Sequence, residues 1–183
     1  MTREKGGLRA VVTLFLITAL MAALLGLVNS VTAGPIANDK AEKTQKALSG
    51  VLAEGVTLGE SLETFPDGTG LVQAVYETSQ GYVIEVTPSG YGGEIDMVVG
   101  IDGQGAVTGV EIISHGETSG LGANAVREDF RSQFVGATGT LAVTKDGGAV
   151  EALTGATMTS RAVTRGVNAA IACAAALEGG NGQ

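Results

Sequence analysis

An uncharged apolar run near the amino terminus, Ala10 to Val28, constrains this chain more than any other feature. Its 19 residues are interrupted only by Thr13, Thr18 and Gly26. As a helix they would span about 28 Å, close to the thickness of the hydrocarbon core of a bilayer. We therefore expect a transmembrane helix over residues 10–31. A cleaved signal peptide is the alternative, since residues 31–33 resemble a cleavage site, but a signal core has only roughly 7–15 apolar residues.

Charge sets the orientation of this helix and limits the partners of the rest. Residues 1–9 carry Arg3, Lys5 and Arg9, so we expect them to stay in the cytoplasm and the rest to face outward. Beyond the apolar run, 18 acidic residues face 8 basic ones, which argues against nucleic acid as a partner. The single cysteine, Cys173, excludes an internal disulfide and a cysteine-ligated metal site, and no metal centre is predicted.

The remainder reads as a stalk followed by one α+β domain. We expect a stalk helix and linker over residues 34–55, the domain over residues 56–178, and a disordered tail over residues 179–183. Residues 55–70 read as a loop. The domain pattern predicts an antiparallel sheet with packed helices, from β-branched runs separated by Gly and Asp turns. The expected strands are 71–76, 82–87, 95–101, 107–113, 141–144 and 150–153, and the expected helices are 123–134 and 160–177.

The entry to the last helix is the first candidate site. Thr154, Thr157, Thr159 and Ser160 crowd it, and a helix amino terminus offers unpaired N–H groups and partial positive charge to a phosphate. An ordinary capped helix start is the alternative, because Ser and Thr are common N-caps. Two further glycine-rich loops, 90–93 and 115–122, have small residues that allow close approach of a flat ligand.

These three loops together resemble a known family. Thr154-Gly-Ala-Thr157-Met-Thr-Ser160 is similar to the flavinylation motif of bacterial FMN-binding domains, [Ser/Thr]-Gly-Ala-Thr-x-Thr-Ser. His115-Gly-Glu-Thr-Ser-Gly-Leu-Gly122 resembles that family's His-x-Glu-Thr-Pro-Gly-Leu-Gly loop, and Gly90-Tyr-Gly-Gly93 its Gly-Tyr-Gly-Gly strand. With one amino-terminal membrane helix, the chain resembles the G subunits of Rnf-type ion-translocating ferredoxin:NAD⁺ oxidoreductases.

The resemblance implies an FMN joined through its phosphate to the Thr157 hydroxyl by a separate flavin transferase that uses FAD. It implies an electron-transfer subunit without a complete catalytic site of its own, in the cell membrane beside lipid and the other subunits of an Rnf complex. The residues implied to hold the phosphate end are Thr154, Gly155, Ala156, Thr159 and Ser160. Those implied to line the ring are His115, Glu117, Thr118, Leu121 and Gly122, with Tyr91, Gly92 and Gly93 nearby.

Two positions depart from the family's pattern. Glu151 stands where the family has Asp, three residues before the motif, and Ser119 stands where the ring loop has Pro. The C subunit of the Na⁺-pumping NADH:quinone oxidoreductase shares the domain and is the alternative within the class. A membrane-anchored flavin sensor and a cofactor-free structural module are the alternatives outside it.

Overall fold

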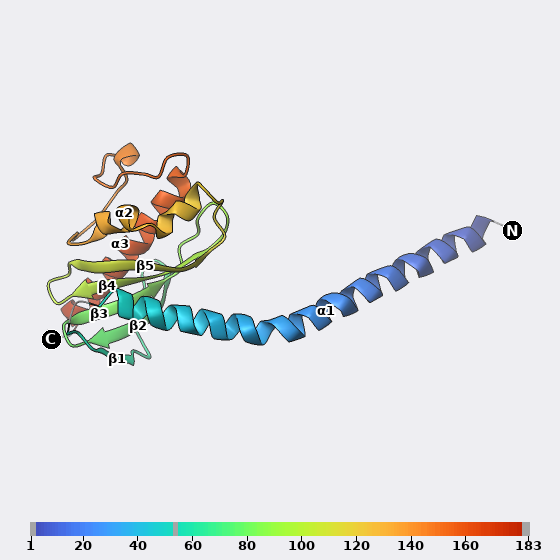
Figure 1. The fold of residues 1–183 in the computed structure, drawn as a ribbon, viewed down its shortest axis with the longest axis horizontal. Coiled ribbons are helices and arrows are strands. Elements are labelled where there is room, and N and C mark those ends of the chain that lie inside the picture. Colours follow the sequence, from blue (N-terminus) through green and yellow to red (C-terminus); the bar gives the residue numbers. More distant parts are fainter. Residues whose placement is uncertain (1–2, 53–54, 181–183) are drawn as a thin grey trace. The chain divides into compact units, whose positions relative to one another are not determined.

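The computed structural model describes residues 3–52 and 55–180 of the chain. It divides into two compact units, Met1–Glu42 and Lys43–Gln183. The first unit is helical, and the second holds the sheet and the shorter helices (Figure 1). The amino-terminal helix α1, Arg3–Gly50, begins in the first unit and ends in the second. The predicted cytoplasmic segment includes residues 1 and 2, which lie outside the described residues.

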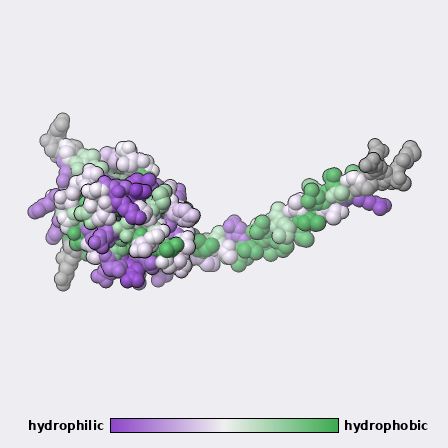
Figure 2. Space-filling model, turned by 90° about the horizontal axis from the view of Figure 1, so that it is seen from above, coloured by the Kyte–Doolittle hydropathy of each residue, from purple (hydrophilic) through white to green (hydrophobic). Residues whose placement is uncertain are grey.

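Helix α1 contains the apolar run. By length and composition, Gly7–Gly50 is suited to crossing a membrane, with a mean hydropathy of 2.7 in its most apolar window. Figure 2 shows apolar side chains over much of its visible surface. The hydroxyls of Thr18 and Thr32 donate to carbonyls one turn earlier, at 3.0 and 2.9 Å. These polar groups are therefore satisfied inside the helix, as a lipid environment requires.

The predicted membrane and stalk helices form one continuous helix. Pro35 lies inside α1, where its missing N–H removes one helical hydrogen bond without ending the helix. The helix ends at Gly50, within the segment 34–55 predicted to hold the stalk helix and its linker.

The second unit is built on a five-stranded sheet in the order β1-β2-β3-β4-β5. Every neighbouring pair is antiparallel, which confirms the α+β class with an antiparallel sheet. The strands are β1 Leu58–Ser61, β2 Val72–Thr78, β3 Gly81–Val86, β4 Ile95–Asp102 and β5 Val107–His115. Strand β1 falls within the segment predicted to be a loop. All of its residues are exposed, and it pairs only along the outer edge of β2.

Apolar side chains cover both faces of the sheet. One face packs Ile84, Met97 and Val99 against helix α3, Thr157–Gly180, whose buried residues include Val163 and Val167. This helix is longer than the predicted 160–177. It includes Gly179 and Gly180 from the predicted disordered tail, whose residues 181–183 lie outside the described part.

The opposite face packs against the last turn of α1. Ala47, Leu48 and Val51 join Val83, Val98 and Ile113 in a second buried cluster. Gly100 and Gly109 are paired across β4 and β5, directly beneath Val51. A Cβ at Gly100 would lie 2.6 Å from the Val51 carbonyl oxygen, so this pair of glycines makes room for the helix end. The Thr108 hydroxyl donates to the same carbonyl at 2.8 Å.

Three predicted elements after β5 are wrong, one helix and two strands. The predicted helix 123–134 is three short pieces, η1 Gly122–Val126, α2 Glu128–Arg131 and η2 Ser132–Phe134. The chain is extended at Arg127, with ψ of 142°. Phe130 and Phe134 still enter the core and contact edge to face at 5.6 Å, whereas Val126 is 43% exposed. The spacing of apolar residues indicates which side chains are buried but not where the backbone breaks. It therefore predicted one continuous helix.

The predicted strands 141–144 and 150–153 are also replaced. A single parallel bridge joins Val143 to Val150. Between them lies the short helix η3, Thr144–Asp146. Both bridging valines are buried, so the apolar pattern reported burial correctly but not extended pairing.

Candidate functional site

The start of α3 and the two glycine-rich loops come together around one cavity. Its volume is about 490 Å³, within the range of small-molecule sites. It is lined by residues from all three predicted loops: Tyr91, Glu117, Thr118, Leu121, Gly122, Gly155, Ala156, Thr157, Met158 and Thr159.

One buried carboxylate, that of Glu117, ties these loops together. The backbone N–H groups of Tyr91 and Gly92 donate to its Oε1 at 2.8 and 3.0 Å. The Thr159 hydroxyl donates to its Oε2 at 2.6 Å. Glu117 is only 8% exposed, and its partners come from the loop 90–93 and from the start of α3. We call this arrangement the Glu117 latch.

Glycines make the latch sterically possible. A Cβ at Gly90 would lie 2.2 Å from the Glu117 Oε1, and one at Gly122 would lie 2.5 Å from its Oε2. A Cβ at Gly92 would lie 2.1 Å from the carbonyl oxygen of Gly116. Several glycines of the loops are therefore required by the packing around the carboxylate.

The latch also sets the charge of Glu117. Burial raises the pKa of the carboxyl, but hydrogen bonds from Thr159, Gly92 and Tyr91 outweigh burial, and His115 adds to their effect. The pKa of Glu117 therefore lies below its ordinary value, and the group is ionised at neutral pH. The Nδ1 of His115 accepts the Glu117 backbone N–H at 3.2 Å, which fixes the start of the loop.

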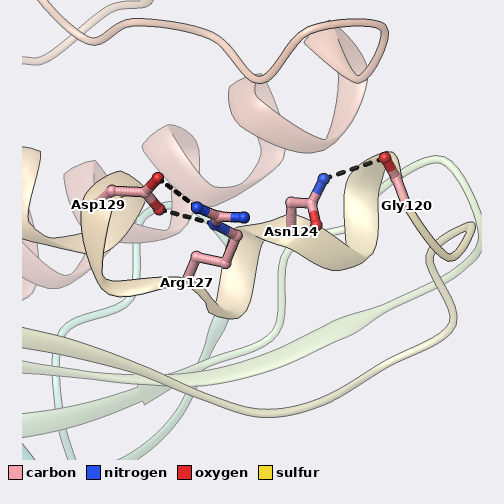
Figure 3. A network of polar contacts seen from close by, with 4 residues as sticks. All are labelled: Gly120, Asn124, Arg127 and Asp129. Atoms are coloured by element: carbon pink, nitrogen blue, oxygen red, sulfur yellow. Dashed lines mark hydrogen bonds and ion pairs between the residues drawn. The ribbon is translucent and has the colours of Figure 1, made fainter.

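The far end of the same loop is closed by Asn124. Its Nδ2 donates to the Gly120 carbonyl oxygen at 3.0 Å, and Arg127 forms a two-bond ion pair with Asp129 just beyond (Figure 3). Gly120 has a φ of +77°, a conformation that favours glycine. The loop therefore enters η1 in a defined turn.

Helix α3 begins at Thr157, directly at the cavity. Gly155 precedes it with a φ of +75°, and a Cβ there would lie 3.0 Å from the Leu121 side chain. The Ser160 N–H bonds to the Ala156 carbonyl oxygen at 3.0 Å, so the N–H groups before it belong to the open first turn. Thr157 presents its hydroxyl at this partly positive end.

Other residues of the predicted site lie beside the cavity. Ser160 is fully buried, accepts the Leu153 N–H at 2.9 Å and donates to the Ala156 carbonyl oxygen, so it shapes the turn. Thr154 and Glu151 line a neighbouring groove of about 530 Å³. Gln133 fixes the backbone of Glu151 through both its amide atoms, at 2.7 and 3.3 Å. Among the predicted residues, His115, Gly92 and Gly93 are also outside the cavity lining.

Sequence reasoning missed two residues at this site. Met158 lines the cavity with an exposed apolar side chain. Lys145 Nζ donates to the Thr157 Oγ1 at 3.0 Å. The available signal for Lys145 was its rarity, because it is the one lysine after position 46 in the sequence.

Comparisons with known proteins include the segment that forms the site and extend beyond it. The FMN-binding domain family matches residues 90–172. The G subunit of the ion-translocating oxidoreductase complex of Methanosarcina acetivorans is 30% identical over 188 residues, which cover 98% of this chain and 100% of that protein. The G subunit of the Na⁺-translocating ferredoxin:NAD⁺ oxidoreductase complex of Acetobacterium woodii is 34% identical over 180 residues, 86% of each chain.

A shorter match and a solved structure add to these. The G subunit of the proton-translocating ferredoxin:NAD⁺ oxidoreductase complex of Clostridium ljungdahlii is 43% identical over 103 residues, 54% of this chain and 56% of that protein. The crystal structure of the C subunit of the Na⁺-translocating NADH–quinone reductase of Parabacteroides distasonis has a TM-score of 0.52 and 20% identity. The superposition covers 73% of this chain and 89% of the C subunit. At this identity the likeness shows the fold alone.

Proposed function

Because this chain belongs to the family of G subunits of ion-translocating oxidoreductase complexes, we propose that it relays electrons through an FMN bound covalently at Thr157. The observation that carries the proposal is the position of the Thr157 hydroxyl. It stands at the open first turn of α3 and on the wall of a cavity built from three separate loops. A phosphate joined there would lie where a helix terminus stabilises negative charge.

The residues around the cavity fit an FMN. Leu121, Ala156 and Met158 offer apolar surface to a flat ring, and Thr118 offers a polar edge. Bound FMN would supply one-electron exchange with neighbouring cofactors, while this chain supplies position and burial. An ester through the phosphate leaves the ring free of covalent change, so the pocket sets its environment.

Placement in a membrane complex is the second part of the proposal. Helix α1 would anchor the chain in the cell membrane, with its basic amino terminus in the cytoplasm and the FMN domain outside. Its partners would be the other subunits of an Rnf-type complex, and a flavin transferase would mature it. Ferredoxin and NAD⁺ chemistry would belong to those other subunits.

The C subunit of a Na⁺-pumping NADH:quinone oxidoreductase is the second candidate. Its shared fold favours it, but the identity of 20% is below the 30% and 34% found over nearly the whole chain for G subunits. Copurification decides between them, because a ferredoxin-linked complex supports the first function and a quinone-linked complex supports the second.

The covalent bond is tested by expressing the full chain with a flavin transferase. After denaturing electrophoresis we expect a fluorescent flavin band and a mass increase of one FMN less one water. Thr157→Ala should abolish both. Thr138→Ala is the matched control, since it removes an exposed threonine hydroxyl outside both the motif and the cavity. Fluorescence that persists in Thr157→Ala would refute the assignment, and a wild type without flavin would favour the structural alternative.

A further inference from the structure

Lys145 occupies a position that the proposed function leaves unexplained. Its ammonium nitrogen donates to the Thr157 Oγ1 at 3.0 Å, across 12 residues of sequence. This oxygen is the atom that would be joined to the FMN phosphate. The contact therefore concerns the modification itself, and it comes from a turn outside the three predicted loops.

The turn that carries Lys145 is firmly held. Val143, two residues earlier, is 1% exposed in the core. The Asp146 N–H donates to the Val143 carbonyl oxygen at 2.8 Å. A Cβ at Gly148 would lie 2.0 Å from the Ala142 carbonyl oxygen, so the chain closes tightly behind the turn.

A two-bond ion pair joins the same turn to α3. Arg161 donates to both carboxylate oxygens of Asp146, at 2.7 and 2.5 Å. Arg161 lies one helical turn after Thr157 on α3. The turn with Lys145 and the helix start with Thr157 are therefore fixed to each other by a second contact, independent of the lysine.

The distribution of charge singles out Lys145. Residues 56–180 contain five basic residues, and three of them, Arg127, Arg131 and Arg161, each pair with a carboxylate. Arg165 donates to the Ser89 carbonyl oxygen at 2.8 Å. Within the described part of the chain, Lys145 forms no ion pair with a carboxylate. Among the described residues 56–180, Lys145 and Arg165 are thus the two basic residues without an ion pair to a carboxylate, and of these two Lys145 contacts the Thr157 hydroxyl.

We propose that Lys145 is a positioning residue for the covalent modification of Thr157, an inference that rests on the proposed function. Its ammonium donates to Oγ1 and so directs the hydroxyl proton and the remaining lone pair away from itself. After transfer, the same charge faces the phosphodiester and offsets its negative charge.

The reaction balances without any change of oxidation state. The Thr157 Oγ1 forms a bond to the FMN phosphorus of FAD, and the bond from that phosphorus to the bridging pyrophosphate oxygen breaks. AMP leaves with the electron pair of the broken bond. The hydroxyl proton passes to a base of the flavin transferase. Lys145 keeps its protons throughout and acts only through hydrogen bonding and charge.

The test measures how fast covalent flavin appears on the full chain in detergent, with FAD and purified transferase. Lys145→Gln should slow labelling by about tenfold, the loss expected for a charge-assisted hydrogen bond. Lys145→Arg should recover part of the rate. Added salt should slow the wild type more than Lys145→Gln, a readout that a merely structural residue would not move. Lys46→Gln, which removes another exposed lysine, should label at the wild-type rate.

The outcomes separate this inference from the proposed function. A wild type that is labelled, with Lys145→Gln labelled equally fast, overturns the role of Lys145 and leaves the covalent FMN standing. A wild type that never acquires flavin overturns the proposed function itself. Slow labelling of Lys145→Gln and Lys145→Arg alike, with a lowered melting temperature in both, overturns the positioning role in favour of a structural one.

Discussion

Removing the charge of Glu117 while keeping its shape tests whether one carboxylate holds the three loops together. Glu117→Gln is nearly isosteric. Its amide oxygen still accepts from the Tyr91 and Gly92 N–H groups, which lie 2.8 and 3.0 Å from Oε1 in the wild type. Its amide nitrogen then faces the Thr159 hydroxyl, which has to turn from donor to acceptor. The substitution therefore weakens all three bonds without opening a cavity.

The size of the effect follows from these three bonds. A hydrogen bond to a charged group contributes about 1.5–3 kcal/mol, against roughly 0.5–1.5 kcal/mol for a neutral one. Losing the charge at three bonds should therefore lower the free energy of unfolding by about 3 kcal/mol at pH 7. This is a large share of the roughly 5–15 kcal/mol that holds a domain folded.

The lowered pKa of Glu117 determines how the stability difference between wild type and Glu117→Gln changes with pH. The pKa of Glu117 is lower in the folded chain than its ordinary value, so its contribution is present above the unfolded pKa of about 4.3. The contribution is lost as pH falls through the folded pKa. The protonated wild type then resembles Glu117→Gln, and the difference between the two proteins should shrink below about pH 4.

Urea titration of the full chain in detergent measures this difference. The chain has no tryptophan and 3 tyrosines, so tyrosine fluorescence reports unfolding without interference. Glu63→Gln is the control, because that exposed carboxylate has no part in the latch and should change stability by less than about 0.5 kcal/mol. A Glu117→Gln protein as stable as the control at pH 7, or a gap that persists unchanged in acid, would refute the latch.

Two further predictions concern packing. Gly122→Ala places a Cβ 2.5 Å from the Glu117 Oε2 and 2.6 Å from the Thr159 Oγ1, so we expect a loss of about 1–3 kcal/mol in urea unfolding and less covalent flavin. Gly103→Ala, whose Cβ would meet nothing closer than 3.4 Å, should behave as wild type, and equal loss in both would count against the steric argument. Burial, with a smaller effect of Asp67, raises the pKa of the Cys173 thiol, so iodoacetamide at pH 8 should label it only after denaturation. Rapid labelling of the native chain would show that the thiol is not covered in the folded domain.

The sequence predicted the central strands because their apolar runs are bounded by Gly and Asp turns. It could not predict β1, because Leu58-Gly-Glu-Ser61 has no β-branched residue and its side chains are all exposed. Apolar spacing reported which residues are buried after β5, but the same burial is compatible with a broken helix as well as a continuous one. Secondary-structure propensity and the spacing of apolar residues predict which side chains are buried, whereas breaks in a helix such as that at Arg127 depend on tertiary packing.

The candidate site was likewise predicted only in part from the sequence. Motif resemblance indicated which loops meet, and the structure brings them to one cavity. The partners of Glu117 and the contact of Lys145 were beyond sequence reasoning, because both join positions far apart in the chain. The individual ligand roles of the motif residues stay predictions until flavin is measured on the variants.

The geometry separates the residues of the site into two physical groups. Glu117, Gly122 and Thr159 build the latch that holds the loops at the correct distance. Thr157 and Lys145 stand on the open side, where a phosphate would arrive. Substitutions in the first group should lower stability and labelling together, because an unlatched loop opens the cavity. Substitutions in the second should lower labelling at unchanged stability, because these side chains are partly or fully exposed and hold no core. Plotting labelling rate against unfolding free energy for both groups therefore distinguishes a residue that shapes the site from one that acts in it.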